Sequence, residues 1–360
     1  MFRKKFNIIK IIFILIALIV SFFYGAGVSV YKWFPFEEIL IVKQIVIPKK
    51  TVFDVSINHQ KNQTFTSYLN HRNELKKSVI VGNELINITQ EPRDEMSDLL
   101  KIKIYGLTVS GVLTKAINSK KCLRIYIQGH GGDPFKFEYH NELLDSFIKE
   151  GCDTLSLSMV GIGLNSGNIS FPTHFGNMNL NKQQAAIHIL YSFFYDSSRP
   201  QLDPLSLFLS PHYYLINHLI NEYEDTAILG ISGGGWYTVW LAALMPEINR
   251  SISYAASLPS EYRKYIENIG DWEDTQSHVY GKTNYWWLYR LMTIDEEGNP
   301  NRNAILVYNS LDKCCYRDPA ATHFQKEIES LNWQNLSVII DEERDHVMNV
   351  NLVKKIFQNR

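Results

Sequence analysis

Short apolar runs alternate with amphipathic segments from residue 101 onward. Residues 101–128 contain three β-like runs separated by Gly and Asn-Ser turns, and the last run is almost wholly apolar. Apolar residues at helical spacing follow at 138–150, and another strand is expected at 154–159. A strand, a helix and a second strand in this order are typical of a parallel sheet, because parallel neighbours need a crossover connection.

The same alternation continues to the end of the chain. It predicts an α/β fold with a mostly parallel, doubly wound sheet, in which ligands bind at the carboxyl ends of the strands. Helices are expected at 182–195, 213–223, 236–244, 323–331 and 347–357, and strands at 227–231, 253–256, 304–308 and 336–340.

The first 31 residues have a different pattern. Arg3, Lys4 and Lys5 precede an apolar run that extends, with small residues, over residues 11–31, which is about the 20 residues needed to span a bilayer. Small residues at 25–27 also fit a signal-peptide cleavage site. We expect a single membrane anchor with the rest of the chain outside the cytoplasm, and the alternative is a secreted protein.

Domain boundaries follow from these patterns. Residues 1–31 are expected to form the anchor or signal, 32–100 a stalk or amino-terminal extension without chemistry, and 101–360 the catalytic domain. An insertion at 258–303 separates two late strands and is much longer than an ordinary connection. It is rich in Trp and Tyr, so it is either a cap that lines a substrate pocket or a segment packed onto the sheet.

Composition excludes some classes of protein. The 360 residues are 45% hydrophobic, enough for a large core, and a net charge of -1 without a basic block argues against nucleic-acid binding. The four cysteines form no C-x-x-C pair, which argues against a structural metal site or a disulfide framework. We expect buried thiols, with a bond between Cys314 and Cys315 as the alternative.

One short segment carries a nucleophile motif. Residues 230–234 read Gly-Ile-Ser-Gly-Gly between an expected strand and an expected helix. This matches the G-x-S-x-G elbow, in which a tight turn exposes a serine hydroxyl above the sheet. Ser232 is therefore the candidate nucleophile.

A serine hydroxyl needs an imidazole as base and an acid to orient that imidazole. Asp312 follows the expected strand 304–308, and His346 follows the expected strand 336–340. Both therefore lie in loops at the carboxyl ends of strands. The alternative acids are Asp318, Asp271, Glu273 and Asp274.

In this order of Ser, Asp and His the chain resembles the α/β-hydrolase superfamily, over residues 101 to the carboxyl terminus. The resemblance implies a triad of Ser232, Asp312 and His346. It also implies an oxyanion hole from the N–H of Gly233 and one N–H of the loop His130-Gly131-Gly132, where Gly131 and Gly132 are both candidates. His130 is expected to order this loop.

These residues predict a serine hydrolase that acts on a small-molecule ester or acyl substrate and needs no cofactor or metal. The triad does not define the leaving group, so an amide or peptide hydrolase is the alternative enzyme. A non-catalytic binding protein on this fold is a third hypothesis, but it predicts a missing triad member, whereas all three are present.

Overall fold

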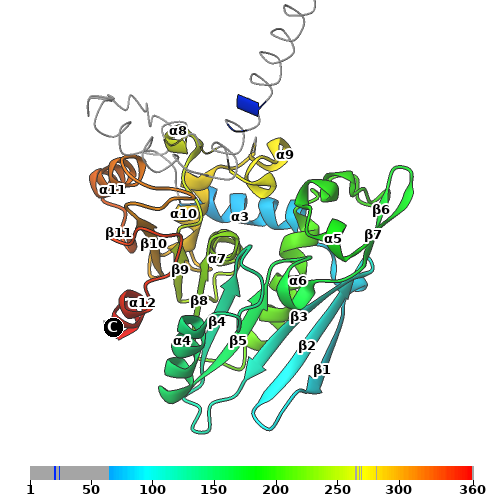
Figure 1. Ribbon diagram of the computed structural model, residues 1–360, viewed down its shortest axis with the longest axis horizontal. Helices are drawn as coiled ribbons and strands as arrows, with labels where there is room; N and C mark the ends of the chain where they lie inside the picture. Colours follow the sequence, from blue (N-terminus) through cyan, green and yellow to red (C-terminus); the bar gives the residue numbers. More distant parts are fainter. Residues whose placement is uncertain are drawn as a thin grey trace, which may run out of the picture. The chain divides into compact units, whose positions relative to one another are not determined.

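The computed structural model describes residues 65–263, 266, 268, 270–280 and 282–358, together with Val20, Ser21 and Tyr24 (Figure 1). The chain divides into two units, residues 1–56 and 57–360. Apart from those three helical residues, the predicted anchor at 11–31 lies outside the described residues. In the described part of the chain, no helix is both long and apolar enough to cross a membrane.

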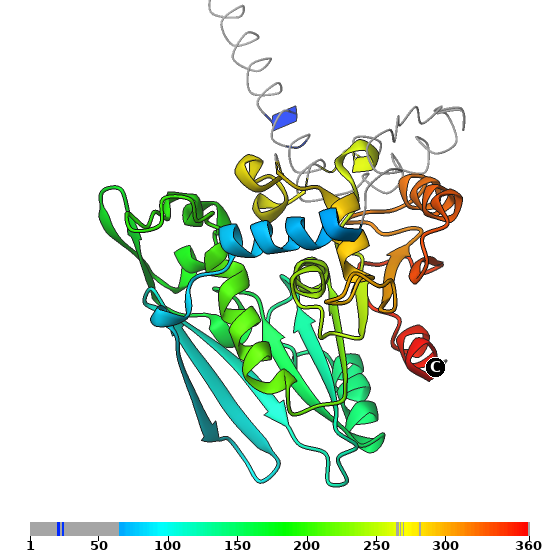
Figure 2. The same cartoon turned by 180° about the vertical axis from the view of Figure 1, so that it is seen from behind.

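Within the described residues, a nine-stranded sheet forms the centre of the second unit (Figures 1 and 2). The first three pairs from one edge are antiparallel and the other five are parallel, which confirms the predicted mostly parallel α/β sheet. In spatial order the strands are β1 (Asn87–Pro92), β2 (Ser97–Ile104), β3 (Leu107–Thr114), β5 (Cys152–Ser158), β4 (Cys122–Gln128), β8 (Asp225–Ile231), β9 (Arg250–Tyr254), β10 (Asn303–Asn309) and β11 (Leu336–Asp341).

Helices cover both faces of the sheet (Figures 1 and 2). On one face, α4 (Glu138–Lys149) packs against α12 (Val350–Gln358), whose buried Val353 and Phe357 join the apolar cluster under the sheet. The opposite face carries α3 (Phe65–Val79), α6 (Ser206–Ile220), α7 (Gly233–Leu244) and α10 (Tyr285–Met292), which contact one another. The remaining helices are α5 (Lys182–Ala185), α8 (Ser260–Arg263), α9 (Ser277–Tyr280), α11 (Ala320–Leu331) and the 3-10 turns η1 (Asn83–Leu85), η2 (Gly163–Asn165), η3 (His188–Phe193) and η4 (Trp272–Asp274).

The main body begins earlier than the sequence pattern indicated. The predicted boundary at residue 101 falls inside β2, and β1 and β2 form the edge of the central sheet. Buried Arg72 attaches α3 to this body, because its guanidinium donates hydrogen bonds to the carbonyl oxygens of Ala243, Leu291, Ile294 and Asp295. Residues 65–100 therefore pack on the folded body, as an amino-terminal extension would.

The helix predicted at 182–195 is wrong as a continuous element. Asn181 and Gln184 form a reciprocal capping box that starts α5, but Ile187 leaves helical backbone angles and a 3-10 turn, η3, follows. A small hairpin of β6 (Ile169–Thr173) and β7 (Gly176–Leu180) precedes it. The break allows His188, at the start of η3, to enter the interior.

The prediction of buried thiols is also wrong. Cys122 and Cys152 are directly paired in the register of β4 and β5, and a disulfide joins them with a Cα–Cα distance of 4.7 Å. A second disulfide joins the neighbouring residues Cys314 and Cys315, as the alternative prediction had it. The sequence contains no local pattern that predicts the bond between Cys122 and Cys152, because only the register of the two strands brings these cysteines together.

Candidate active site

The turn between β8 and α7 has the geometry predicted for a nucleophile elbow. Ser232 lies there with φ 57° and ψ −131°, a left-handed conformation that costs a non-glycine residue about 1–3 kcal/mol. Two backbone hydrogen bonds hold it, from the Ser232 N–H to the oxygen of Tyr254 (2.9 Å) and from the Trp236 N–H to the oxygen of Ser232 (3.0 Å). The surrounding backbone therefore fixes the strained turn.

Two glycines of the motif are needed for close packing. A Cβ at Gly234 would lie 1.9 Å from the carbonyl oxygen of Ile127 in β4, and a Cβ at Gly230 would lie 2.3 Å from the oxygen of Gly234. Such distances are impossible without a shift of the backbone. The glycines thus allow α7 to begin directly against β4.

His346 and Asp312 form a hydrogen-bonded pair in the loops after β11 and β10. The Nδ1 of His346 lies 2.7 Å from Oδ2 of Asp312. The other oxygen, Oδ1, accepts the N–H groups of Cys314 (2.7 Å) and Cys315 (3.0 Å). The Asp312 side chain is fully buried, whereas that of His346 is 22% exposed. The carboxylate therefore fixes the imidazole with Nδ1 as the donor and leaves the lone pair on Nε2.

Ser232 lines a small cavity of about 30 Å³. Cys315 lines the same cavity, and its sulfur lies within 4.8 Å of a ring nitrogen of His346. Buried Nε2 of His346 has no hydrogen-bond partner within the described residues. The hydroxyl of Ser232 is therefore not hydrogen bonded to this nitrogen in the structure.

The rival acids have other partners. Oδ1 of Asp318 accepts the N–H (3.0 Å) and the hydroxyl (2.7 Å) of Thr322 in the first turn of α11. Asp274 pairs with Arg263, and Glu273 pairs with His188. Each of these carboxylates thus has a role away from His346.

The loop after β4 lies directly against the elbow. A Cβ at Gly129 would be 2.8 Å from both the nitrogen of Gly233 and the Cβ of Ser232. The N–H of Gly132 already donates to the oxygen of Gly129 (3.1 Å), and the oxygen of Gly132 accepts the Ser158 hydroxyl (3.0 Å). Of the two candidate glycines, Gly132 therefore has its N–H engaged within the turn.

The insertion lines the cavity with polar groups. Its contribution comes from Asn268, Gly270, Asp271, Glu273 and Asp274. None of the aromatic residues of the insertion in the described part of the chain lies in the cavity wall. Three of the alternative acids, Asp271, Glu273 and Asp274, thus line the same cavity as the candidate nucleophile.

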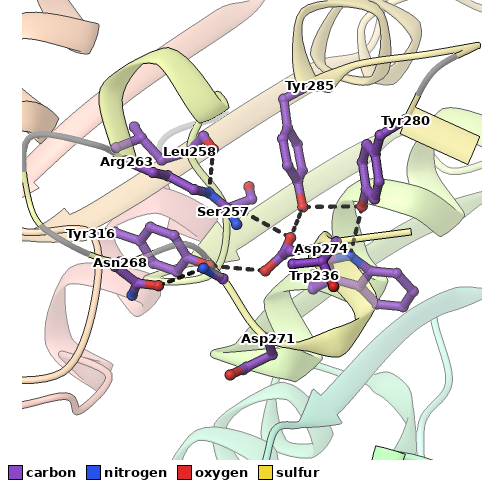
Figure 3. Close-up of polar contacts among 12 residues, drawn as sticks. Trp236, Ser257, Leu258, Arg263, Asn268, Asp271, Asp274, Tyr280, Tyr285 and Tyr316 are labelled. Carbon is purple, nitrogen blue, oxygen red and sulfur yellow. Dashed lines mark hydrogen bonds and ion pairs between the residues drawn. The ribbon is translucent and has the colours of Figure 1, made fainter. Parts of the chain in front are cut away.

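Figure 3 shows how Asp274 is held. Oδ1 accepts hydrogen bonds from Arg263 (2.9 Å) and from the Tyr285 hydroxyl, and Oδ2 accepts the Tyr316 hydroxyl (3.3 Å). Tyr280, beside Tyr285, accepts the indole N–H of Trp236 at 3.2 Å. These buried aromatic side chains pack the insertion onto α7, which supports the packing interpretation of the insertion.

A second histidine–carboxylate pair lies near the elbow. Nδ1 of His188 is 2.6 Å from Oε1 of Glu273, and Nε2 of His130 is 3.7 Å from the same oxygen. Burial alone would raise the pKa of Glu273, but the hydrogen bond from His188 and the charges of His188 and His130 outweigh it and lower the pKa. Sequence patterns missed His188, because the predicted helix gave it no position near the site.

No model of a known protein family matches the sequence, and no curated protein sequence matches it. Solved structures do. Acetyl xylan esterase 1 from Thermoanaerobacterium sp. is 14% identical with a TM-score of 0.51, over 82% of this chain and 92% of that one. The acylaminoacyl peptidase of Pyrococcus horikoshii is 13% identical with a TM-score of 0.48, over 76% of this chain but only 41% of that one.

Est1E from Butyrivibrio proteoclasticus is 17% identical with a TM-score of 0.44, over 72% of this chain and 95% of that one. At such identities the likeness is one of fold. The strand order, the parallel half of the sheet and the likeness to the acetyl xylan esterase agree: the chain has the fold of the α/β-hydrolase superfamily.

Proposed function

We propose that this protein is a serine hydrolase that cleaves carboxylic esters, with Ser232 as nucleophile, His346 as base and Asp312 as the orienting acid. One observation carries the proposal. A serine held at positive φ after β8 lines a cavity together with Cys315, and the sulfur of Cys315 lies within 4.8 Å of a ring nitrogen of His346, whose Nδ1 binds a fully buried carboxylate. A surface serine or histidine needs neither arrangement.

The reaction would proceed in two halves. Oγ of Ser232 attacks the ester carbonyl while Nε2 of His346 takes the hydroxyl proton, and the alcohol then leaves with that proton. A water molecule attacks the acyl-serine in the same way and releases the acid. Asp312 stays ionised and stabilises the imidazolium through the 2.7 Å hydrogen bond.

The developing oxyanion needs two N–H donors. The first donor is the N–H of Gly233, the first residue of α7. Gly131 is the better candidate for the second donor, because the Gly132 N–H is already hydrogen bonded to the oxygen of Gly129. Removing one such donor typically costs about 3 kcal/mol of transition-state stabilisation. His130, between Gly129 and Gly131, positions this loop.

The site favours a short acyl group on a neutral or cationic small molecule. The cavity of about 30 Å³ has room for only about two water molecules. Three carboxylates line it, from Asp271, Glu273 and Asp274. Arg263 offsets the charge of Asp274, so the negative charge that an anionic substrate would meet comes from Asp271 and Glu273.

The proposed location is outside the cytoplasm, through the anchor predicted at 11–31 or after cleavage of a signal. The disulfide between Cys122 and Cys152 supports this proposal, because such bonds persist in oxidising compartments. Protease accessibility of the chain in intact cells and in lysed cells would test it.

Replacement of the nucleophile tests the proposed function. Ser232→Ala should reduce hydrolysis of p-nitrophenyl acetate by at least about 10³-fold and abolish labelling by a fluorophosphonate, while circular dichroism remains unchanged. The matched control is Ser166→Ala, which changes an exposed serine and should keep both activities.

The same assay separates the alternatives. Acetyl esters, matched acetyl amides and esters of longer acids should be compared with the wild-type chain. Higher kcat/KM for the amide would identify an amide hydrolase. A folded wild-type chain that turns over neither substrate would favour a binding protein.

A further inference from the structure

Three potential metal ligands converge beside the elbow from different parts of the chain. His130 follows β4, His188 begins η3, and Glu273 lies in η4. One ligand atom from each lies within 4.8 Å of the others. The proposed hydrolysis uses neither His188 nor Glu273, so the cluster needs a separate explanation.

Burial makes the cluster more than a surface group of charges. The side chains of His188 and Glu273 are 5% and 4% exposed, whereas that of His130 is 39% exposed. Oε2 of Glu273 and Nε2 of His188 are buried without a hydrogen-bond partner among the described residues. Burial without a hydrogen bond is unfavourable for a carboxylate oxygen, so a ligand that binds the Glu273 carboxylate would be favoured.

We propose that His130, His188 and Glu273 bind one divalent transition-metal ion, with Zn²⁺ as the natural candidate. Two imidazoles and a carboxylate form a ligand set that zinc uses when a fourth position stays open. With bonds of about 2.1 Å in tetrahedral geometry, ligand atoms lie about 3.4 Å apart. The distances to Oε1 of Glu273, 2.6 Å from His188 and 3.7 Å from His130, fall on either side of this value.

Asp271 completes the arrangement on the far side of the His130 ring. Its Oδ2 lies 3.8 Å from Nδ1 of His130, while Nε2 of that ring faces Glu273. A carboxylate behind a histidine ligand is the usual partner that fixes the ring and its tautomer. At 3.8 Å the contact is longer than a hydrogen bond, so Asp271 contributes negative charge beside the His130 ring and does not fix its tautomer.

The fourth position would open toward Ser232. His130, Glu273 and Ser232 line the same cavity, so a bound ion would hold a water or a substrate oxygen next to the serine hydroxyl. Binding of the ion does not depend on hydrolysis. The metal test and the nucleophile test can therefore fail separately.

Another group of possible ligands, Cys314, Cys315 and His346, also lies near the cavity. Its two sulfurs are joined in a disulfide, whereas a thiolate is the form of cysteine that binds a metal. His346 is moreover already bound to Asp312 through Nδ1. This group serves as the competing location in the experiment.

The test uses the untagged full-length chain after treatment with a chelator. Titration with Co²⁺, followed by its visible absorption bands, should show saturable binding of one equivalent, and Zn²⁺ should displace it. His130→Gln and Glu273→Gln should each weaken Co²⁺ binding by at least about tenfold. Circular dichroism would verify that each variant is folded.

His174→Gln is the matched control, because it removes an exposed histidine and should leave Co²⁺ affinity unchanged. Ser232→Ala should also retain the ion, which separates this proposal from the hydrolytic one. Absence of saturable Co²⁺ binding by the folded chain would overturn the proposal. So would unchanged affinity in both ligand variants, or a loss of affinity in His346→Gln alone.

Discussion

Two hydrogen-bonded histidine–carboxylate pairs in the described part of the chain have nearly equal lengths but different surroundings. His346 and Asp312 are 2.7 Å apart in loops at the carboxyl ends of β11 and β10, whereas His188 and Glu273 are 2.6 Å apart in two 3-10 turns outside the sheet. The two bonds alone do not distinguish the pairs. The second oxygen of each carboxylate does.

Oδ1 of Asp312 accepts two backbone N–H groups, so every strong acceptor of that carboxylate is satisfied without a ligand. Oε2 of Glu273 is buried and has no partner among the described residues. The first environment holds one imidazole in a fixed tautomer, as a general base requires. The second leaves an acceptor open, as a cation site requires.

The largest expected effect comes from breaking the first pair. Asp312→Asn should reduce kcat for p-nitrophenyl acetate by about 10⁴-fold, because the amide no longer favours the tautomer with Nδ1 protonated. In the same steady-state assay, the fold loss of kcat in Glu273→Gln should be at least 100 times smaller than that in Asp312→Asn, because Glu273 has no part in the proton transfer. Equal losses in the two variants would remove the distinction between the pairs.

A smaller effect is expected at Asp318, the other acid in the loop of Asp312. Asp318→Asn should keep kcat close to the wild-type value, because an amide oxygen still accepts the hydrogen bonds from Thr322. Asp318→Ala should lower the free energy of unfolding by about 1 kcal/mol through loss of these bonds. Urea denaturation measures this change, and a kcat loss in Asp318→Asn larger than that in Asp312→Asn would transfer the acid role.

The smallest effect is a pH dependence of the second pair. The pKa of Glu273 is lowered from its ordinary value of 4.5, despite the opposing effect of burial, by His188 and His130. The Glu273 carboxylate therefore binds a proton less readily in the folded chain than in the unfolded chain. The stability that ionised Glu273 contributes is complete above about pH 4.5, and it is lost as the pH falls through the lowered pKa of the folded chain. The difference in free energy of unfolding between wild type and Glu273→Gln should shrink below pH 4.5, as urea titrations at several pH values would show. A difference that grows on acidification contradicts the lowered pKa.

Local patterns were sufficient for the parallel part of the sheet and for the elbow. An apolar strand, a glycine turn and a helix are encoded within residues 225–244, and the loops of Asp312 and His346 directly follow apolar strands. The assignment of these three residues to a triad stays a prediction. The structure adds the hydrogen bond between Asp312 and His346, which no local pattern contains.

Long-range features were not predictable from the sequence. Buried Arg72 binds carbonyl oxygens of residues 171 to 223 positions away, so α3 gave no sign that it belongs to the main body. His188 meets Glu273 across 85 positions, and only after α5 ends early. Such contacts depend on the tertiary arrangement of several elements and leave no periodic signal.

The bond between Cys122 and Cys152 has a consequence for how the protein must be produced. It joins the first residues of β4 and β5, whose far ends lead to the oxyanion loop and to Ser158. Closing a loop of 30 positions in the unfolded chain is worth about 3–4 kcal/mol in the chain-entropy account. Protein expressed in a reducing cytosol would contain Ser232, Asp312 and His346 but lack the stability that this disulfide provides. Low activity of such a preparation would therefore reflect the missing bond and not the chemistry of the site.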